Sequence, residues 1–210
     1  MTESAELYTT VEKEAVAEFE EKRSVFIGHA MPVKTEEEAQ AFIKSVKSKY
    51  QDARHNVYAY VLGDGTLQRY SDDGEPQGTA GMPVLDVIRK SKCTDTAIVV
   101  TRYFGGILLG AGGLVRAYSH AAKLALDAAH VITYEKYFEA ELVCSYSDYS
   151  KYLSETEKFG VINDGVDFAE NVTMKLAVKA VRFDDFEKTV TELSFGKILP
   201  RKVGEKFDYR

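Results

Sequence analysis

Apolar and polar residues alternate along much of the first part of the chain, which is the pattern of half-buried β-strands. Where apolar residues instead recur every three or four positions after a capping residue, helices are expected. These patterns predict strands over 10–19 and 24–33, followed by a helix opened by a capping box at Thr35. A hairpin of strands 55–62 and 66–70 follows, and then a turn-rich stretch over 71–82. A short helix is expected from Pro83 to about Lys90.

The following segment combines a strand, several glycines and a helix. The stretch TAIVVTRY over residues 96–103 is apolar and β-branched, as in a strand buried on both faces. Glycines follow it, and a helix is predicted from about Leu114 to Ala129. This order of elements places a glycine loop between the end of a strand and the beginning of a helix.

The last third of the chain has the order βαββαβ, which is typical of a ferredoxin-like unit. Its expected strands cover 137–144, 161–168, 171–180 and 196–207, and its expected helices cover 148–158 and 183–194. We therefore predict an α+β protein of two domains, residues 1–134 and 135–210, with the boundary between 131 and 136.

Charge is distributed unevenly along the 210 residues. The chain carries 27 Lys and Arg against 33 Asp and Glu, a net charge of -6. Residues 1–21 form an acidic arm that holds all of this excess, whereas residues 89–123 carry a local charge of +5. This balance argues against a protein that is cationic on all sides, but it leaves room for a local patch that binds an anion.

The sequence also indicates the compartment. No apolar run approaches the roughly 20 residues that a membrane span needs. The N-terminus lacks the basic and apolar regions of a signal peptide. Cys93 and Cys144 are not spaced as a metal or redox site, so they are expected to be free thiols in a reducing compartment. We expect a cytoplasmic protein that does not enter a membrane.

A glycine loop flanked by arginines is the first candidate site. Eight of the 15 glycines lie between residues 74 and 113. A strand, glycine loop and helix can direct several backbone N–H groups and the helix dipole toward an anion, although glycines also serve tight turns and close packing alone. Arginine can bind phosphate with two hydrogen bonds, and Tyr103 or Phe104 could stack on a base. The candidate anion-binding or nucleic-acid-binding residues are Arg54, His55, Asn56, Arg102, Tyr103, Gly105, Gly106, Gly110, Gly112, Gly113 and Arg116.

A second candidate is an acidic loop consisting of Ser71, Asp72, Asp73, Gly74 and Glu75. Its carboxylates could hold a hydrated Mg²⁺ ion, but the same residues are typical of a surface turn. His55 and Asn56 at the start of a strand could take part in acid–base chemistry or could cap a neighbouring loop. We expect no metal and no cofactor, and we expect these segments to meet in one cleft.

Four stretches of the chain resemble the bacterial YigZ/IMPACT family: KRSVFIGHAMPV at 22–33, ARHNVYAYVL at 53–62, YSDDGEPQGTAGMPVL at 70–85 and VVTRYFGGILLGAGGLVRAYSHAA at 99–122. The resemblance implies an N-terminal domain with the fold of ribosomal-protein second domains and domain IV of elongation factor G. It implies a C-terminal domain similar to the last domain of that factor. Eukaryotic relatives regulate translation through an additional N-terminal domain, so their specific mechanism is not expected here.

Three functions remain open from the sequence. The first is a translation-associated regulatory protein that binds the ribosome or RNA through the arginine-flanked glycine loop, and this is our leading hypothesis. The second is an enzyme acting on a nucleotide or phosphorylated small molecule, because the N-terminal fold is also that of the GHMP kinases, although their serine-rich loop is replaced here. The third is a protein-binding module that uses the C-terminal sheet. The ligand, any protein partner and the oligomeric state are not determined by the sequence.

Overall fold

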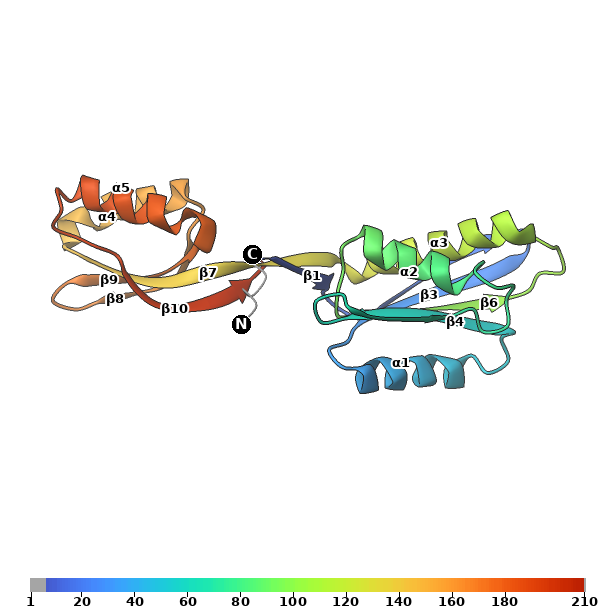
Figure 1. Ribbon diagram of the computed structural model, residues 1–210. Helices are drawn as coiled ribbons and strands as arrows, with labels where there is room; N and C mark the ends of the chain where they lie inside the picture. The colour runs from blue at the N-terminus through green and yellow to red at the C-terminus, as the bar shows by residue number, and fades with distance from the viewer. Residues whose placement is uncertain (1–6, 210) are drawn as a thin grey trace. The chain divides into compact units, whose positions relative to one another are not determined.

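The computed structural model describes residues 7–209, which form two compact units (Figure 1). The first, here called the N-terminal unit, comprises residues 8–133. The second, the C-terminal unit, comprises residues 134–209 together with Leu7. Each unit contains both helices and an antiparallel sheet, so the predicted two-domain α+β class is confirmed.

Ten strands and five α-helices make up these residues, together with one turn of 3₁₀-helix at Ala180–Arg182. In chain order they are β1 (Leu7–Val11), β2 (Ala15–Glu21), β3 (Ser24–Pro32), α1 (Glu36–Lys49), β4 (His55–Leu62), β5 (Leu67–Ser71), α2 (Gly81–Lys90), β6 (Thr96–Tyr103), α3 (Gly110–Ala129), β7 (Val131–Cys144), α4 (Tyr146–Lys158), β8 (Ile162–Phe168), β9 (Val172–Lys179), α5 (Phe183–Leu193) and β10 (Arg201–Asp208).

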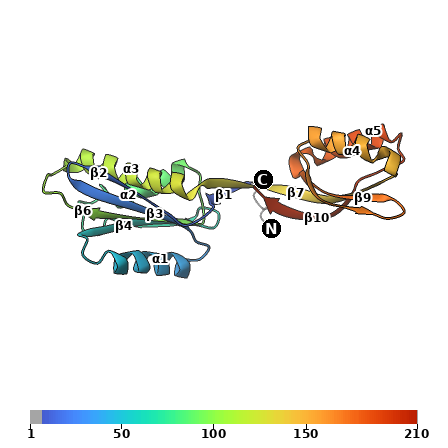
Figure 2. The same cartoon turned by 180° about the vertical axis from the view of Figure 1, so that it is seen from behind.

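The N-terminal unit is a five-stranded antiparallel sheet covered by helices on both faces. The strand order is β2-β3-β6-β4-β5. Helix α1 lies on one face and helices α2 and α3 lie on the other, as both views show (Figures 1 and 2). The central strand β6 is buried along almost its whole length, as its continuous apolar sequence predicts.

Two hydrophobic cores fill the spaces between this sheet and its helices. Phe26, Ile98 and Leu126 belong to the core under α2 and α3, and Phe42 belongs to the core under α1. The helix α3 approaches the sheet closely at Gly28, where an added Cβ would lie 2.5 Å from the carbonyl oxygen of Ala121. Gly28 is therefore required by backbone proximity rather than by a special φ angle.

The C-terminal unit has the predicted order βαββαβ, formed by β7, α4, β8, β9, α5 and β10. Its strands lie in the order β10-β7-β9-β8, and α4 and α5 cover one face of the sheet (Figure 1). Leu142, Leu176 and Phe186 belong to the core beneath these helices. The alternation of apolar and polar residues in β9 therefore reflects one covered face and one open face.

Several predicted boundaries were wrong. The strand expected over 10–19 is divided into β1 and β2, because the backbone N–H groups of Glu12 and Lys13 bond to the carbonyls that end α3. Helix α3 begins at Gly110 rather than at Leu114. The strand expected from 137 begins at 131, and the last strand begins at Arg201 rather than at 196. The acidic arm lies outside the described residues over 1–6, and over 7–21 it forms β1, β2 and their connection.

Candidate functional site

Three segments that are distant in the sequence line one pocket of the N-terminal unit. They are the start of β4, the acidic loop that follows β5, and the region from the end of β6 to the first turns of α3. The pocket encloses about 440 Å³. Its lining residues are Arg54, His55, Gly74, Glu75, Pro76, Arg102, Phe104, Leu108, Leu109, Gly110, Ala111 and Leu114. We call this cavity the β4–α3 pocket.

Glu75 and Arg102 form a buried ion pair in the wall of this pocket. Nη1 of Arg102 donates to Oε1 of Glu75 over 2.6 Å, and the side chains are 6% and 4% exposed. Tyr118 on α3 donates its hydroxyl to the same oxygen over 2.7 Å. Burial, followed by the carboxylate of Glu75, raises the pKa of Tyr118, so its hydroxyl remains a donor.

Arg102, which the sequence suggested as an anion ligand, is buried and already paired. Its guanidinium is engaged by Glu75, and Nη2 lies 3.5 Å from the hydroxyl of Ser24. Nε is buried and has no hydrogen-bond partner among the described residues. Because a charge reversal at this buried position would disrupt the fold, Arg102 is a structural residue of the pocket wall and is not used below as an exposed anion ligand.

His55 lines the pocket and has one ring nitrogen engaged by the backbone. Nδ1 lies 2.8 Å from the backbone carbonyl oxygen of Asp73, so this nitrogen donates. In the neutral ring Nε2 is then an acceptor, and it lies 3.9 Å from Oε1 of Glu75. Asn56, by contrast, is buried, and its side chain accepts a hydrogen bond from Thr101, which makes it part of the sheet core.

The acidic loop uses its aspartates to hold its own backbone. Asp72 accepts hydrogen bonds from the N–H groups of Gly78, Ala80 and Gly81, at the beginning of α2. Asp73 accepts from Lys47 and from the N–H of residue 56.

These contacts occupy oxygens of both aspartates that the sequence offered as magnesium ligands. Ser71 accepts a hydrogen bond from the N–H of Asp73, which orders the loop further. No group of three His, Cys, Asp or Glu residues within residues 7–209 is arranged to hold a metal ion. Asp72 and Asp73 thus hold backbone N–H groups and Lys47, whereas the third offered carboxylate, Glu75, pairs with Arg102.

The candidate glycines have several different roles. Gly110, Gly112 and Gly113 lie in the first turn of α3 rather than in a loop. Gly106 and Gly110 have positive φ angles, of 83° and 71°, at the two ends of the connecting segment. Gly105 is needed for proximity, because an added Cβ would lie 2.0 Å from the carbonyl of Arg23. We call residues 104–109 the glycine loop.

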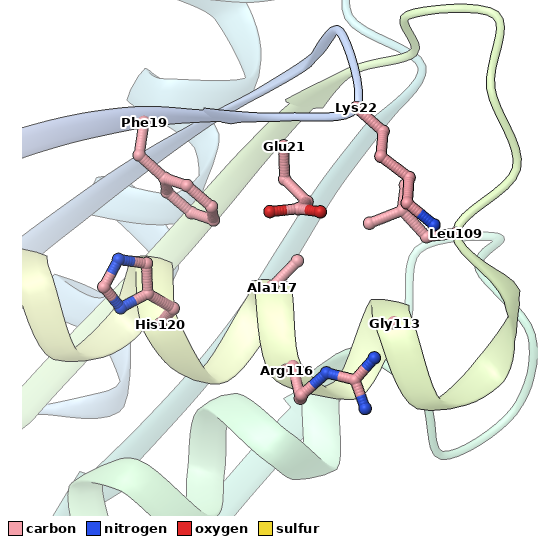
Figure 3. Close-up of a pocket in the computed structure, with 8 residues that line it drawn as sticks. All are labelled: Phe19, Glu21, Lys22, Leu109, Gly113, Arg116, Ala117 and His120. Carbon is pink, nitrogen blue, oxygen red and sulfur yellow. The ribbon is translucent and has the colours of Figure 1, made fainter.

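A second pocket lies on the other side of the start of α3 and contains Arg116 (Figure 3). Lys22 extends toward Leu109, and Arg116 lies beside Gly113, so two cations from different elements line one cavity. Glu21 also points into this space. The structure therefore separates Arg116 from Arg102, which the sequence had grouped together.

Lys22 and Arg23 are functional candidates that sequence reasoning missed. They form the two-residue turn of the β2–β3 hairpin, with Glu21 paired to Ser24. Both have positive φ, of 49° and 63°, where Asn and Gly are usual. The signal available in the sequence was a pair of basic residues between two alternating segments.

Four cations around the glycine loop are exposed, namely Lys22, Arg23, Arg54 and Arg116. None of them forms an ion pair with another residue in the described part of the chain. We call this set the cationic rim. Tyr103, in contrast, donates its hydroxyl to Asp52, which lies before β4.

The sheet of the C-terminal unit carries ion pairs on its strands. Arg201 pairs with Glu141, Lys175 with Asp167 at 2.8 Å, and Lys136 with Glu205 at 2.6 Å. Charged groups that are already paired offer little net charge to a nucleic acid. The unpaired cations of the glycine-loop region are therefore the stronger candidate for anion binding.

Within residues 7–209, the helices are all too short or too polar to cross a membrane.

Models of known protein families match both units of the chain. The model of the Impact N-terminal domain matches residues 22–126, and that of a domain of unknown function (DUF1949) matches residues 142–197. A solved structure described as "Crystal structure of an hypothetical protein" is similar with a TM-score of 0.60 and 30% identity, covering 95% of this chain and 98% of the other.

Named relatives extend the similarity over most of the sequence. IMPACT family member YvyE of Bacillus subtilis is 38% identical over 191 residues, covering 90% of this chain and 88% of the relative. IMPACT family member YigZ of Escherichia coli is 35% identical over 183 residues, covering 84% and 88%. The chain belongs to the IMPACT family.

Proposed function

We propose that this protein is a translation-associated regulator that binds RNA, free or in the ribosome, through the cationic rim of its N-terminal unit. The observation that carries the proposal is the convergence of four exposed, unpaired cations on one glycine loop. Lys22 and Arg116 line one pocket beside the loop, and Arg54 lines the other. The backbone of Arg23 packs closely against Gly105 at the start of the loop.

The charge pattern fits a phosphate backbone better than a small isolated anion. The four cations come from the β2–β3 turn, the start of β4 and helix α3, so they surround the loop instead of meeting at one point. A nucleic acid offers a row of phosphates to such a set, and each contact releases counterions. Membership of the IMPACT family, whose eukaryotic members regulate translation, supports a translation-associated role.

An exposed aromatic residue adds a means of contacting bases. Phe104 is 40% exposed at the beginning of the glycine loop, beside Arg102, whose Cζ lies 5.5 Å from the ring centre. Aromatic side chains next to cations bind single-stranded nucleic acids without regard to sequence. Ile107 and Leu108 of the same loop are also exposed, which is unusual for apolar side chains without a partner.

The test is binding of a fluorescently labelled single-stranded RNA, measured by anisotropy at several salt concentrations, together with co-sedimentation with purified ribosomes. Four phosphate contacts predict a slope of about -3 in log affinity against log salt, since each contributes about -0.7 on a single strand. Affinity should therefore fall roughly fiftyfold between 50 and 200 mM salt.

The decisive variant is Lys22→Glu/Arg116→Glu, which reverses two rim charges at exposed positions. It should weaken binding at least tenfold and reduce the salt slope. A matched control is Lys44→Glu/Lys90→Glu, which changes the net charge equally at exposed lysines that line neither pocket of the rim. Equal losses in the two variants, or binding that does not depend on salt, would contradict the proposal.

A further inference from the structure

With His55 in its neutral form, two acceptors among the residues lining the β4–α3 pocket receive no hydrogen bond from the described part of the chain. Oε1 of Glu75 accepts from Arg102 and Tyr118, but no described residue donates to Oε2. Nε2 of His55 is an acceptor in the neutral ring, and Oε1 of Glu75, 3.9 Å away, is also an acceptor. The Glu75 side chain is only 4% exposed, so a group that fills this position must enter the pocket.

The mouth of the same pocket attracts negative charge. Helix α3 is 20 residues long and begins at Gly110, which lines the pocket. No side chain caps this end and no acidic residue lies in its first turn, so its first backbone N–H groups have no partner within the helix. Arg54 is exposed at the other side of the opening.

The remaining wall is apolar. Phe104, Leu108 and Leu114 line the pocket between the start of α3 and the end of β6. Phe104 and Leu108 are 40% and 83% exposed, so they offer a surface to a flat apolar group. A ligand that suits all three parts carries an anion, a flat ring system and two hydrogen-bond donors.

We propose that the β4–α3 pocket binds a ribonucleotide with a free 2′,3′-diol. The two ribose hydroxyls donate to Glu75 and His55, the 5′-phosphate lies between Arg54 and the beginning of α3, and the base lies against Phe104. A carboxylate that accepts hydrogen bonds from a ribose also occurs in dinucleotide-binding folds. The volume of about 440 Å³ falls in the range of small-ligand sites.

This inference rests on the proposed function and names the part of an RNA that the protein recognises. Within an RNA chain, a free diol next to a 5′-phosphate occurs only at the 3′-terminal nucleotide. Outside RNA chains, the same chemistry occurs in a free nucleoside 5′-monophosphate. The cationic rim then binds the backbone that precedes this nucleotide. The protein is thus expected to prefer RNA ends over continuous strands.

The experiment compares a 5′-labelled 12-nucleotide RNA ending in an ordinary ribonucleotide with the same RNA ending in a 2′,3′-dideoxynucleotide. We expect the diol to bind about tenfold more tightly, because its hydroxyls donate to buried acceptors that the dideoxy end leaves unfilled. Competition with adenosine 5′-monophosphate and its 2′,3′-dideoxy form identifies the source of the diol. Displacement by the ribose form alone supports a pocket that also accepts free nucleotides.

Two variants keep the test specific. His55→Asn retains a donor for the carbonyl of Asp73 but removes the acceptor Nε2, so it should reduce the preference for the diol while salt-dependent RNA binding remains. Phe104→Ala removes an exposed ring and should weaken both RNAs equally, by about tenfold if one base stacks there. Circular dichroism confirms that each variant is folded.

The outcomes separate the inference from the proposed function. Equal affinity for the two RNA ends, with steep salt dependence, would overturn the inference and leave the proposed function intact. If neither RNA binds, the proposed function fails, and the nucleotide arm decides the inference alone: binding of the monophosphate with a preference for the diol supports it, and no binding overturns it.

Discussion

Arg102 on β6 and Glu75 in the acidic loop form an ion pair of 2.6 Å with both side chains almost completely buried. Tyr118 of α3 donates to the same carboxylate oxygen, so one group connects the sheet, the loop and the helix. Glu75 has two consequences for the site. It neutralises the arginine near the end of β6, and it lines the β4–α3 pocket.

Breaking this pair from one side should be strongly destabilising. Arg102→Met leaves a buried carboxylate without its cation, which costs about 3–5 kcal/mol of the free energy of unfolding. Arg102→Met/Glu75→Leu should recover part of that loss, because no charge then remains unpaired. Denaturant unfolding followed by circular dichroism measures both. A double variant that is less stable than the single one would show that the apolar pair cannot fill the space.

Substitution by alanine should change the stability of the protein in opposite directions at two glycines. Gly28→Ala places a Cβ 2.5 Å from the backbone oxygen of Ala121, so β3 and α3 must separate, at a cost of about 1–3 kcal/mol. Gly112→Ala meets only the end of the Arg116 side chain, at 3.8 Å, and should stabilise α3 by about 0.5–1 kcal/mol. Thermal unfolding of the two proteins under the same conditions tests this. A change in melting temperature of the same sign in both variants would contradict the assignment of Gly28 to close packing.

Asp72 should act as a structural residue and not as a ligand for a cation. Asp72→Ala removes the acceptor for three backbone N–H groups around the start of α2 and should cost about 1–2 kcal/mol. Asp72→Asn retains an acceptor and should cost less. Addition of millimolar Mg²⁺ should leave the melting temperature of the wild-type protein unchanged. An increase in melting temperature with Mg²⁺ that Asp72→Ala abolishes would instead indicate a metal site in the acidic loop.

His29 should make stability depend on pH below neutrality. Burial, reinforced by the ammonium group of Lys49, lowers the pKa of His29 from 6.5 to about 4. Between these values the unfolded chain binds a proton that the folded protein does not, so the free energy of unfolding falls as the pH decreases. Lowering the pH from 7 to 5 should cost about 2 kcal/mol through this residue.

The control for this effect is His29→Leu, which places an apolar side chain that does not titrate at the buried position next to Tyr50. Its stability should change less between pH 7 and pH 5 than that of the wild-type protein. Urea unfolding at the two pH values provides the comparison. Parallel loss of stability in the two proteins would assign the pH dependence to other groups.

The sequence predicted most of the strands and helices because their periodicity is local. The β6 segment is continuously apolar, and Thr35 does accept a hydrogen bond from the N–H of Glu38 at the beginning of α1. The start of α3 was missed because Gly110, Gly112 and Gly113 suggest a loop. A glycine in a helix costs only about 1 kcal/mol, which packing against the rest of the unit can offset.

The candidate site was predicted in part. The meeting of residues near 54, 75 and 102–111 in one pocket agrees with the expectation from the sequence. The partners of the charged groups could not be predicted, since Arg102 and Glu75 are 27 positions apart and which cations remain exposed depends on packing. Lys22 and Arg23 were missed for the same reason, because a hairpin turn reaches the glycine loop only in three dimensions.

By itself the sequence determined the family, the α+β class and the segments that line the β4–α3 pocket, because motifs and periodicity are properties of neighbouring residues. Only the tertiary structure decided which charges are neutralised and which are free. Arg102 is buried in an ion pair with Glu75, Asp72 accepts hydrogen bonds from the backbone around the start of α2, and Arg116 lies in a different pocket. The physical reason is that the burial and pairing of an ionisable group depend on every element packed around it, and these elements lie far apart in the chain.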